Sequence, residues 1–158
     1  MEKKNKQETK EKNSLLAVVR ISGLVKVKEE IKNTLDRMRL RKKYTCALIN
    51  ASDKNMFGML KKVKYYVAYG SIDEPTLSLL IKNRARVDKS NKEHEKIKIN
   101  PEETAKELMN GKSLKQLGLK PFFRLHPPRK GINSKLQYPK GVLGDNKKDI
   151  NKLIERMI

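Results

Sequence analysis

The sequence predicts an α+β protein, and three observations carry this prediction. Short runs typical of strands occur at three places along the 158 residues, and the first of them is a β-branched run. Segments with apolar residues at helical spacing separate these runs. No run of eighteen or more apolar residues is present, so a membrane-spanning helix is not expected. This order favours a three-stranded, ferredoxin-like sheet with helices packed on one face, so that the other face stays available for a partner.

The first half of the chain is expected to form a strand–helix–strand–helix core over residues 14–70. A β-branched run closed by Gly23 predicts the first strand at residues 15–21. Apolar residues at helical spacing predict the first helix at residues 27–38. The segment YTCALIN predicts the second strand. A second amphipathic helix begins at Met56, carries Val67 on its apolar face and would be ended by Gly70.

Residues 71–120 are expected to form a helical insertion before the third strand. Asp73 is a suitable N-cap for a short helix. The run Asn-Pro-Glu-Glu from Asn100 predicts the start of a second helix, which Gly111 would close. Residues 113–118 predict one further helical turn.

The last segment, residues 121–158, is expected to contain the third strand, a basic loop and a C-terminal helix. The alternation Phe-Phe-Arg-Leu predicts the strand at residues 121–125. The prolines of HPPRKG, residues 126–131, stop any regular element there. Apolar residues at helical spacing from Ile150 to Met157 predict the terminal helix. Residues 1–13 contain one Met and no other large hydrophobe, so a disordered basic tail is expected.

The charge balance points to a polyanionic partner. The chain has 38 Lys and Arg against 18 Asp and Glu, a formal charge of +20, and an apolar content of 37%. Self-repulsion of this size destabilises a compact chain unless a polyanion neutralises it, and nucleic acid is the commonest such partner. Basic residues gather locally as well, with five cations in the seven residues from Arg37 to Lys43. A helix dipole explains one cation at a helix end but not five.

The loop HPPRKG combines residue types that suit RNA. Two prolines make it rigid, Arg129 and Lys130 can bind phosphate, and Gly131 allows a close approach. An ordinary proline-rich surface loop is the alternative reading of the same residues.

Few features of the sequence favour catalysis or a cofactor. The two histidines have no ligand-like spacing, and the single Cys46 excludes a disulfide framework and a thiolate metal cluster. Gly-rich phosphate loops are absent. We therefore expect no enzyme activity, no catalytic residue, no metal and no cofactor.

Two long motifs resemble one protein family. NTLDRMRLRKKYTCALI at residues 33–49 and FGMLKKVKYYVAYG at residues 57–70 resemble the universal large-subunit ribosomal protein thirty family, called large-subunit protein seven in eukaryotes. The short bacterial form covers about residues 14–66. The helical insertion, FRLHPPRKG and INKLIERMI resemble the longer archaeal and eukaryotic form. The short N-terminal tail favours the archaeal version. Tyr69 and Ala85 depart from the usual residues of the long form.

The resemblance implies a non-enzymatic constituent of the large ribosomal subunit in the cytoplasm. Its expected partners are large-subunit ribosomal RNA, the nearby five-S ribosomal RNA and neighbouring ribosomal proteins, with no membrane. The RNA-binding residues that carry over from the shared core are Arg20, Ser22, Lys26, Arg39, Arg41, Lys42, Lys43, Lys54, Lys61 and Lys62. The longer form adds Arg124, His126, Arg129 and Lys130.

Two other function classes fit parts of the sequence. A free-standing RNA chaperone or general nucleic-acid-coating protein would explain the charge alone. A small enzyme on a ferredoxin-like scaffold, such as an acyl-phosphate hydrolase, would need an Arg and an Asn converging on an anion-holding loop, and no such loop is evident. The ribosomal resemblance outweighs both.

Overall fold

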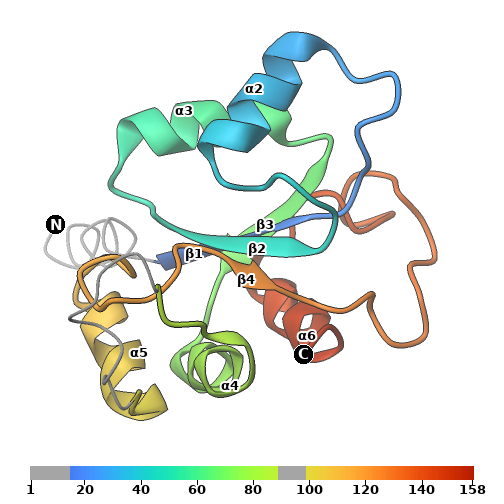
Figure 1. Ribbon diagram of the computed structural model, residues 1–158. Helices are drawn as coiled ribbons and strands as arrows, with labels where there is room; N and C mark the ends of the chain where they lie inside the picture. Colours follow the sequence, from blue (N-terminus) through green and yellow to red (C-terminus); the bar gives the residue numbers. More distant parts are fainter. Residues whose placement is uncertain (1–14, 89–98) are drawn as a thin grey trace, which may run out of the picture.

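A five-stranded sheet with the order β4-β2-β1-β3-β5 runs through the centre of the computed structural model, which describes residues 15–88 and 99–158 (Figure 1). The central strand β1 (Leu15–Arg20) is antiparallel to β2 (Thr45–Asn50) on one side and to β3 (Val67–Ser71) on the other. The short β4 (Phe123–Arg124) is antiparallel to β2, and β5 (Gly144–Asp145) is parallel to β3. The predicted α+β class is confirmed.

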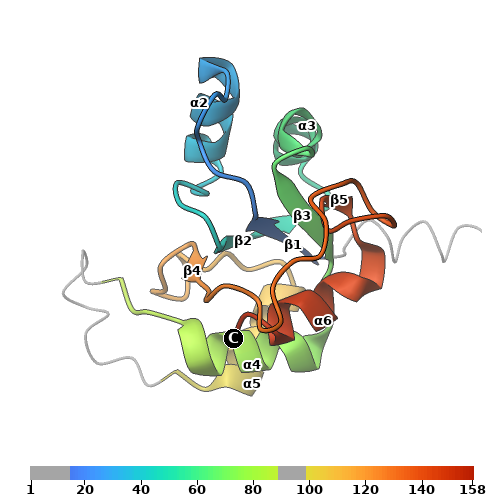
Figure 2. The ribbon, with the colours of Figure 1, turned by 90° about the vertical axis from the view of Figure 1, so that its right-hand side faces the viewer.

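Helices cover both faces of this sheet. On one side lie α2 (Glu29–Arg37) and α3 (Lys54–Val63), and on the other lie α4 (Glu74–Arg84), α5 (Pro101–Met109) and α6 (Ile150–Glu155) (Figures 1 and 2). The expectation that the face opposite α2 and α3 stays available for a partner was wrong, because α4, α5 and α6 cover it.

The residues of β1 show why both faces need a cover. Leu15, Ala17 and Val19 belong to the hydrophobic cluster that α4, α5 and α6 complete, whereas Val18 belongs to the cluster under α2 and α3. Successive side chains of a strand point to opposite faces. A strand that is apolar at nearly every position, as β1 is, must therefore be buried on both sides.

The prediction of a helix continuing to Gly70 was also wrong, because α3 ends at Val63 and β3 follows at Val67. The spacing of Val63 and Val67 fits a helical face, but β1 offers an unpaired edge that Val67–Ser71 fills. Gly70 is required in this strand, since a Cβ there would lie 2.1 Å from the carbonyl oxygen of Lys147. The sheet has five strands rather than three, and the strand expected at residues 121–125 is reduced to two residues at the edge.

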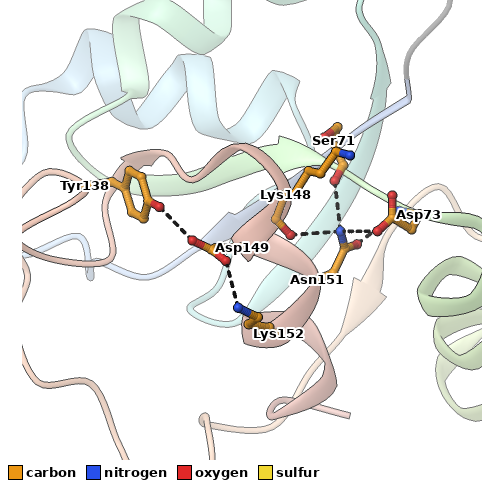
Figure 3. Close-up of polar contacts among 7 residues, drawn as sticks. All are labelled: Ser71, Asp73, Tyr138, Lys148, Asp149, Asn151 and Lys152. Carbon is orange, nitrogen blue, oxygen red and sulfur yellow. Dashed lines mark hydrogen bonds and ion pairs between the residues drawn. The ribbon is translucent and has the colours of Figure 1, made fainter.

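The predicted helices of the second half are present, with different local detail. Asp73 stands at the N-cap position of α4, but its side chain makes no capping bond. Instead it accepts a hydrogen bond of 3.0 Å from Nδ2 of Asn151, which also donates to the carbonyls of Ser71 and Lys148 (Figure 3). This amide fastens α6 to the junction between β3 and α4. Residues 113–118 form turns rather than the expected helical turn.

The expected disordered tail, residues 1–13, lies outside the described residues.

Candidate nucleic-acid interface

Most of the predicted RNA-binding residues lie at one end of the sheet, which we call the basic end. Three loops emerge there: residues 21–28 after β1, residues 38–44 before β2, and residues 125–131 after β4. The register places them together, because Arg124 pairs with Thr45 at the start of β2, and Val19 near the end of β1 pairs with Cys46. The loops occupy the right-hand side of Figure 1 and face the viewer in Figure 2.

Arg20 is the buried support of the basic end. Its side chain is 1% exposed and donates to three backbone carbonyls, those of Ser22 at 3.0 Å and of Leu40 and Arg41 at 2.7 Å each. Burial lowers the pKa of the Arg20 guanidinium, although an arginine stays charged in a protein. These contacts direct the guanidinium inward. Arg20 therefore positions the 38–44 loop and is not placed to meet a phosphate itself.

Arg39 occupies a backbone position that glycine usually fills. The N–H of Arg39 donates to the carbonyl of Asp36 at 2.9 Å, and that of Leu40 to the carbonyl of Leu35 at 2.8 Å. This pair of bonds is the Schellman motif that ends a helix, and its left-handed residue is Arg39 with φ +61°. A side chain in that conformation costs free energy. A cation kept there at such a cost points to a use for its side chain.

An open groove of about 530 Å³ lies between the 38–44 loop and β4. Its walls combine five cations with one carboxylate, two uncharged side chains and no second acid: Asp36, Arg37, Arg39, Arg41, Lys42, Thr45, Phe122 and Arg124. The carboxylate of Asp36 is engaged by the guanidinium of Arg41, with Nε 2.5 Å from Oδ1. The remaining cations of the groove face solvent, and this concentration of positive charge suits an anionic ligand.

The 21–28 loop adds further predicted residues to the basic end. Lys26 is exposed and has φ +57°, and Ser22 is half-buried. Lys43 lies close to this loop, since a Cβ on Gly23 would meet the side chain of Lys43 at 3.1 Å. The loop also carries Val25, which is 87% exposed.

Helix α3 distributes its three predicted lysines between both ends of the sheet. Lys61 and Lys62 lie in its last turn, which leads into β3 at the basic end. The ammonium of Lys61 sits 5.0 Å from the centre of the Phe57 ring, and that of Lys62 is 3.0 Å from a carboxylate oxygen of Glu30. Lys54 begins α3, just after β2 ends, and therefore lies at the opposite end from the other predicted residues.

The C-terminal basic loop, residues 126–131, is fastened to the end of the chain. The N–H groups of His126 and Arg129 each donate at 2.9 Å to carbonyls of Met157 and Arg156. In return, the guanidinium of Arg156 donates to the carbonyl of Arg129 at 2.7 Å and to that of Gly131 at 2.6 Å. The side chains of His126, Arg129 and Lys130 are exposed. The loop thus presents its charges on a backbone fixed by α6.

Sequence comparisons identify the family of the chain. A family model described as ribosomal protein L30p/L7e matches residues 16–67. Large ribosomal subunit protein uL30 of Archaeoglobus fulgidus is 47% identical over 152 residues, which cover 90% of this chain and 99% of that protein. Its counterparts in Nanoarchaeum equitans and Korarchaeum cryptofilum are 40% and 38% identical, with 92% and 91% of this chain covered.

The chain belongs to the L30p/L7e family of ribosomal proteins. The resemblance seen in the sequence is thereby confirmed, and the relatives named here are archaeal. Members of this family are structural proteins rather than enzymes, so the expectation of no enzymatic activity is confirmed by membership. Within the described residues, no three acidic, His or Cys side chains gather as a metal site would require, and no helix has the length and apolar character needed to cross a bilayer.

Two residues of the candidate interface in this L30p/L7e protein were missed by sequence reasoning. Phe122 lines the groove, and Arg156 holds the C-terminal basic loop. The strand alternation of residues 122–125 contained the signal for Phe122, because it places neighbouring phenylalanines on opposite faces. No sequence pattern predicts the role of Arg156, because its partners are backbone carbonyls that only the fold brings close.

Proposed function

We propose that this protein is a structural constituent of the large ribosomal subunit and that its basic end binds large-subunit ribosomal RNA. The groove between the 38–44 loop and β4 supports the proposal most strongly, because it gathers five cations from two distant parts of the sequence. Each Lys or Arg that meets a phosphate releases condensed counterions, which gives affinity without reading sequence. The role of the protein is to neutralise phosphates where RNA helices pack together.

The proposed RNA contacts follow the geometry of the loops. Arg39, Arg41, Lys42 and Arg124 act from the groove, and Ser22, Lys26 and Lys43 from the neighbouring loops. Lys61 and Lys62 extend the surface along α3, and His126, Arg129 and Lys130 extend it along the C-terminal basic loop. Arg20 supports this surface from within, and Lys54 lies apart from it.

The archaeal relatives support a wider set of partners. They bear the name large ribosomal subunit protein, and this chain aligns with almost their full length. We therefore propose neighbouring ribosomal proteins as further partners, in the cytoplasm where ribosomes work. The resemblance of the sequence to the longer form of the family adds the vicinity of the five-S ribosomal RNA to this proposal.

Sedimentation of native cell extract tests the assignment to the subunit. The tagged protein is expected to be recovered stoichiometrically with the large subunit after a high-salt wash. Recovery at the top of the gradient, or loss at the first wash, would instead identify a free-standing RNA chaperone.

Charge removal tests the proposed surface. The double variant Arg39→Gln, Arg124→Gln is expected to weaken binding to large-subunit RNA and to reduce the salt slope by up to about two, one unit for each lost phosphate contact. The matched control is Lys82→Gln with Lys106→Gln, which removes the same charge from exposed positions on α4 and α5, across the sheet from α2 and α3. Equal losses in both double variants would mean that net charge, and not the basic end, governs binding.

A further inference from the structure

The groove at the basic end contains one aromatic residue whose burial the protein core does not explain. Of the three phenylalanines, Phe123 belongs to the large hydrophobic cluster and Phe57 packs against the smaller one. Among the described residues, Phe122 joins neither cluster, yet it is partly buried and lines the groove. Packing in the hydrophobic core therefore does not explain why an apolar ring lies among five cations.

The position of Phe122 follows from the edge strand β4. Phe123 pairs with Cys46 and points into the core, where it is 1% exposed. Its neighbours in the chain must then point to the opposite face, which places Phe122 and Arg124 together. Both residues line the groove, together with Arg39 and Lys42 from the 38–44 loop.

The groove combines an aromatic ring with cations, and in this it differs from a site that binds phosphate alone. Phosphates of a duplex require only cations, because the bases are stacked inside the helix and out of reach. Aromatic rings serve proteins that bind unpaired nucleotides, whose bases have exposed faces. The volume of about 530 Å³ is within the range of sites that enclose small organic ligands.

We propose that this groove binds an unpaired nucleotide of RNA, with its base stacked on Phe122 and its flanking phosphates on Arg39 and Arg124. The proposal rests on the proposed RNA-binding function and adds the kind of RNA structure that this part of the surface selects, namely a bulge or loop rather than a duplex. The carboxylate of Asp36 is neutralised by its ion pair with Arg41, so it does not oppose the binding of phosphates by Arg39 and Arg124.

Substitution of Phe122 separates stacking from charge. The probes are a stem-loop RNA with an unpaired adenosine-rich loop and a fully paired duplex of the same length. Phe122→Leu is expected to weaken binding to the stem-loop about tenfold, in keeping with the contribution of one stacked base, and to leave duplex binding and the salt slope unchanged. Phe122→Tyr, which keeps a ring, is expected to retain stem-loop binding. Thermal unfolding of both variants checks that the core is intact.

A fluorescent variant tests independently whether a base stacks in the groove. The chain contains no tryptophan, so Phe122→Trp places a single indole in the groove. Stacking of a base is expected to quench its emission when the stem-loop is added, and the duplex is expected to leave it unchanged. If Phe122→Leu binds the stem-loop as tightly as the natural protein and the indole is not quenched, the nucleotide site is overturned. In that case, a loss of affinity in Arg39→Gln, Arg124→Gln would still support the proposed RNA surface, and its absence would overturn both.

Discussion

Two basic loops at the same end of the molecule are each held by an arginine, but in opposite surroundings. Arg20 donates to the carbonyls of Leu40 and Arg41 from a position that is 1% exposed. Arg156 donates to the carbonyls of Arg129 and Gly131 from an exposed position. In both cases a guanidinium binds the backbone of the loop, so the cationic side chains of the loop remain outside. The two arginines should differ in their contribution to the free energy of unfolding, because a buried carbonyl that loses its donor cannot form a hydrogen bond with water instead.

The largest expected effect comes from Arg20→Met, which keeps an unbranched apolar stem and removes the donors. The carbonyls of Leu40 and Arg41 lose their charged donor, and the free energy of unfolding should fall by about 2–3 kcal/mol. Chemical denaturation measures this loss. A loss below about 0.5 kcal/mol would show that relief from burying a charge offsets the missing hydrogen bonds, as happens for some buried ionic groups.

The reactivity of the Cys46 thiol gives a second measure of the stability lost in Arg20→Met. Cys46 is fully buried, pairs in the sheet with Val19, and burial raises the pKa of its thiol to about 12. The reactive thiolate is therefore scarce at neutral pH, and the folded protein should not react with thiol reagents. In Arg20→Met, labelling should accelerate by about 30- to 150-fold, the factor that corresponds to 2–3 kcal/mol. Labelling of the natural protein at the rate of a free thiol would contradict the burial.

Arg156→Gln should have a smaller effect on stability, about 1 kcal/mol, because water can replace the lost donors at an exposed site. Its effect on RNA binding should be clearer, since the C-terminal basic loop loses two of its fastenings. Comparison with Arg129→Ala, Lys130→Ala separates the two causes. That variant removes charge and should reduce the salt slope by up to about two without changing stability. An unchanged slope would remove this loop from the contact surface.

Arg39→Gly should raise the stability of the protein and weaken its binding to RNA. Glycine adopts the left-handed conformation without a steric penalty, so the free energy of unfolding should rise by about 0.5 kcal/mol. The same change removes a cation from the groove and should weaken RNA binding, with a salt slope lower by about one. Arg39→Lys is the control, because it keeps both the charge and the strain. A gain of both stability and affinity in Arg39→Gly would refute a functional reason for arginine at this position.

The smallest effect concerns the contact that Tyr138 makes with Asp149 beside the C-terminal basic loop (Figure 3). The Tyr138 hydroxyl, 2.6 Å from the carboxylate, and then Lys152 lower the pKa of Asp149. The same contact raises the pKa of Tyr138. A lowered carboxyl pKa contributes stability above its unfolded value, about 4, and that contribution is lost as the pH falls through the folded value. A raised tyrosine pKa contributes below about 10 and is lost as the pH rises.

Tyr138→Phe should therefore lower the unfolding midpoint slightly between about pH 4 and pH 10 and converge with the natural protein outside that window. Thermal melts across this range measure the difference. A constant difference at all pH values would mean that the hydroxyl acts through packing and not through the carboxylate.

The sequence predicts elements well where the pattern has a single interpretation. β1 and β2 are apolar at most positions, and α2 has one apolar face, so all three lie where expected. The prediction failed at Val67. Its spacing from Val63 fits a helical face, but the segment pairs with the free edge of β1 and forms a strand. Gly144 and Asp145 form β5 without any pattern of their own, since they pair only where the chain returns to β3.

The candidate site was predictable as a set of cations and not as an arrangement. The charge of the 38–44 loop is visible in the sequence, and so is the β1 alternation that places Arg20 on the same face as the buried Val18. The inward direction of Arg20 could have been inferred from that alternation. The meeting of Arg124 with Arg39 could not, because it depends on an edge pairing between segments about eighty residues apart.

The position of α6 has a consequence for how the protein is made. Ile150, Leu153 and Met157 share one hydrophobic cluster with Leu15 and Ala17, so residues far apart in the sequence complete one core. Because a chain is synthesised from its N-terminus, β1 is made long before α6, and the cover of its second face stays incomplete until α6 follows. Until then the nascent chain shows an apolar sheet surface together with dense positive charge. The residues of α6 thus close a fold whose first strand was made much earlier, and a chain stalled before Ile150 is expected to be prone to aggregation.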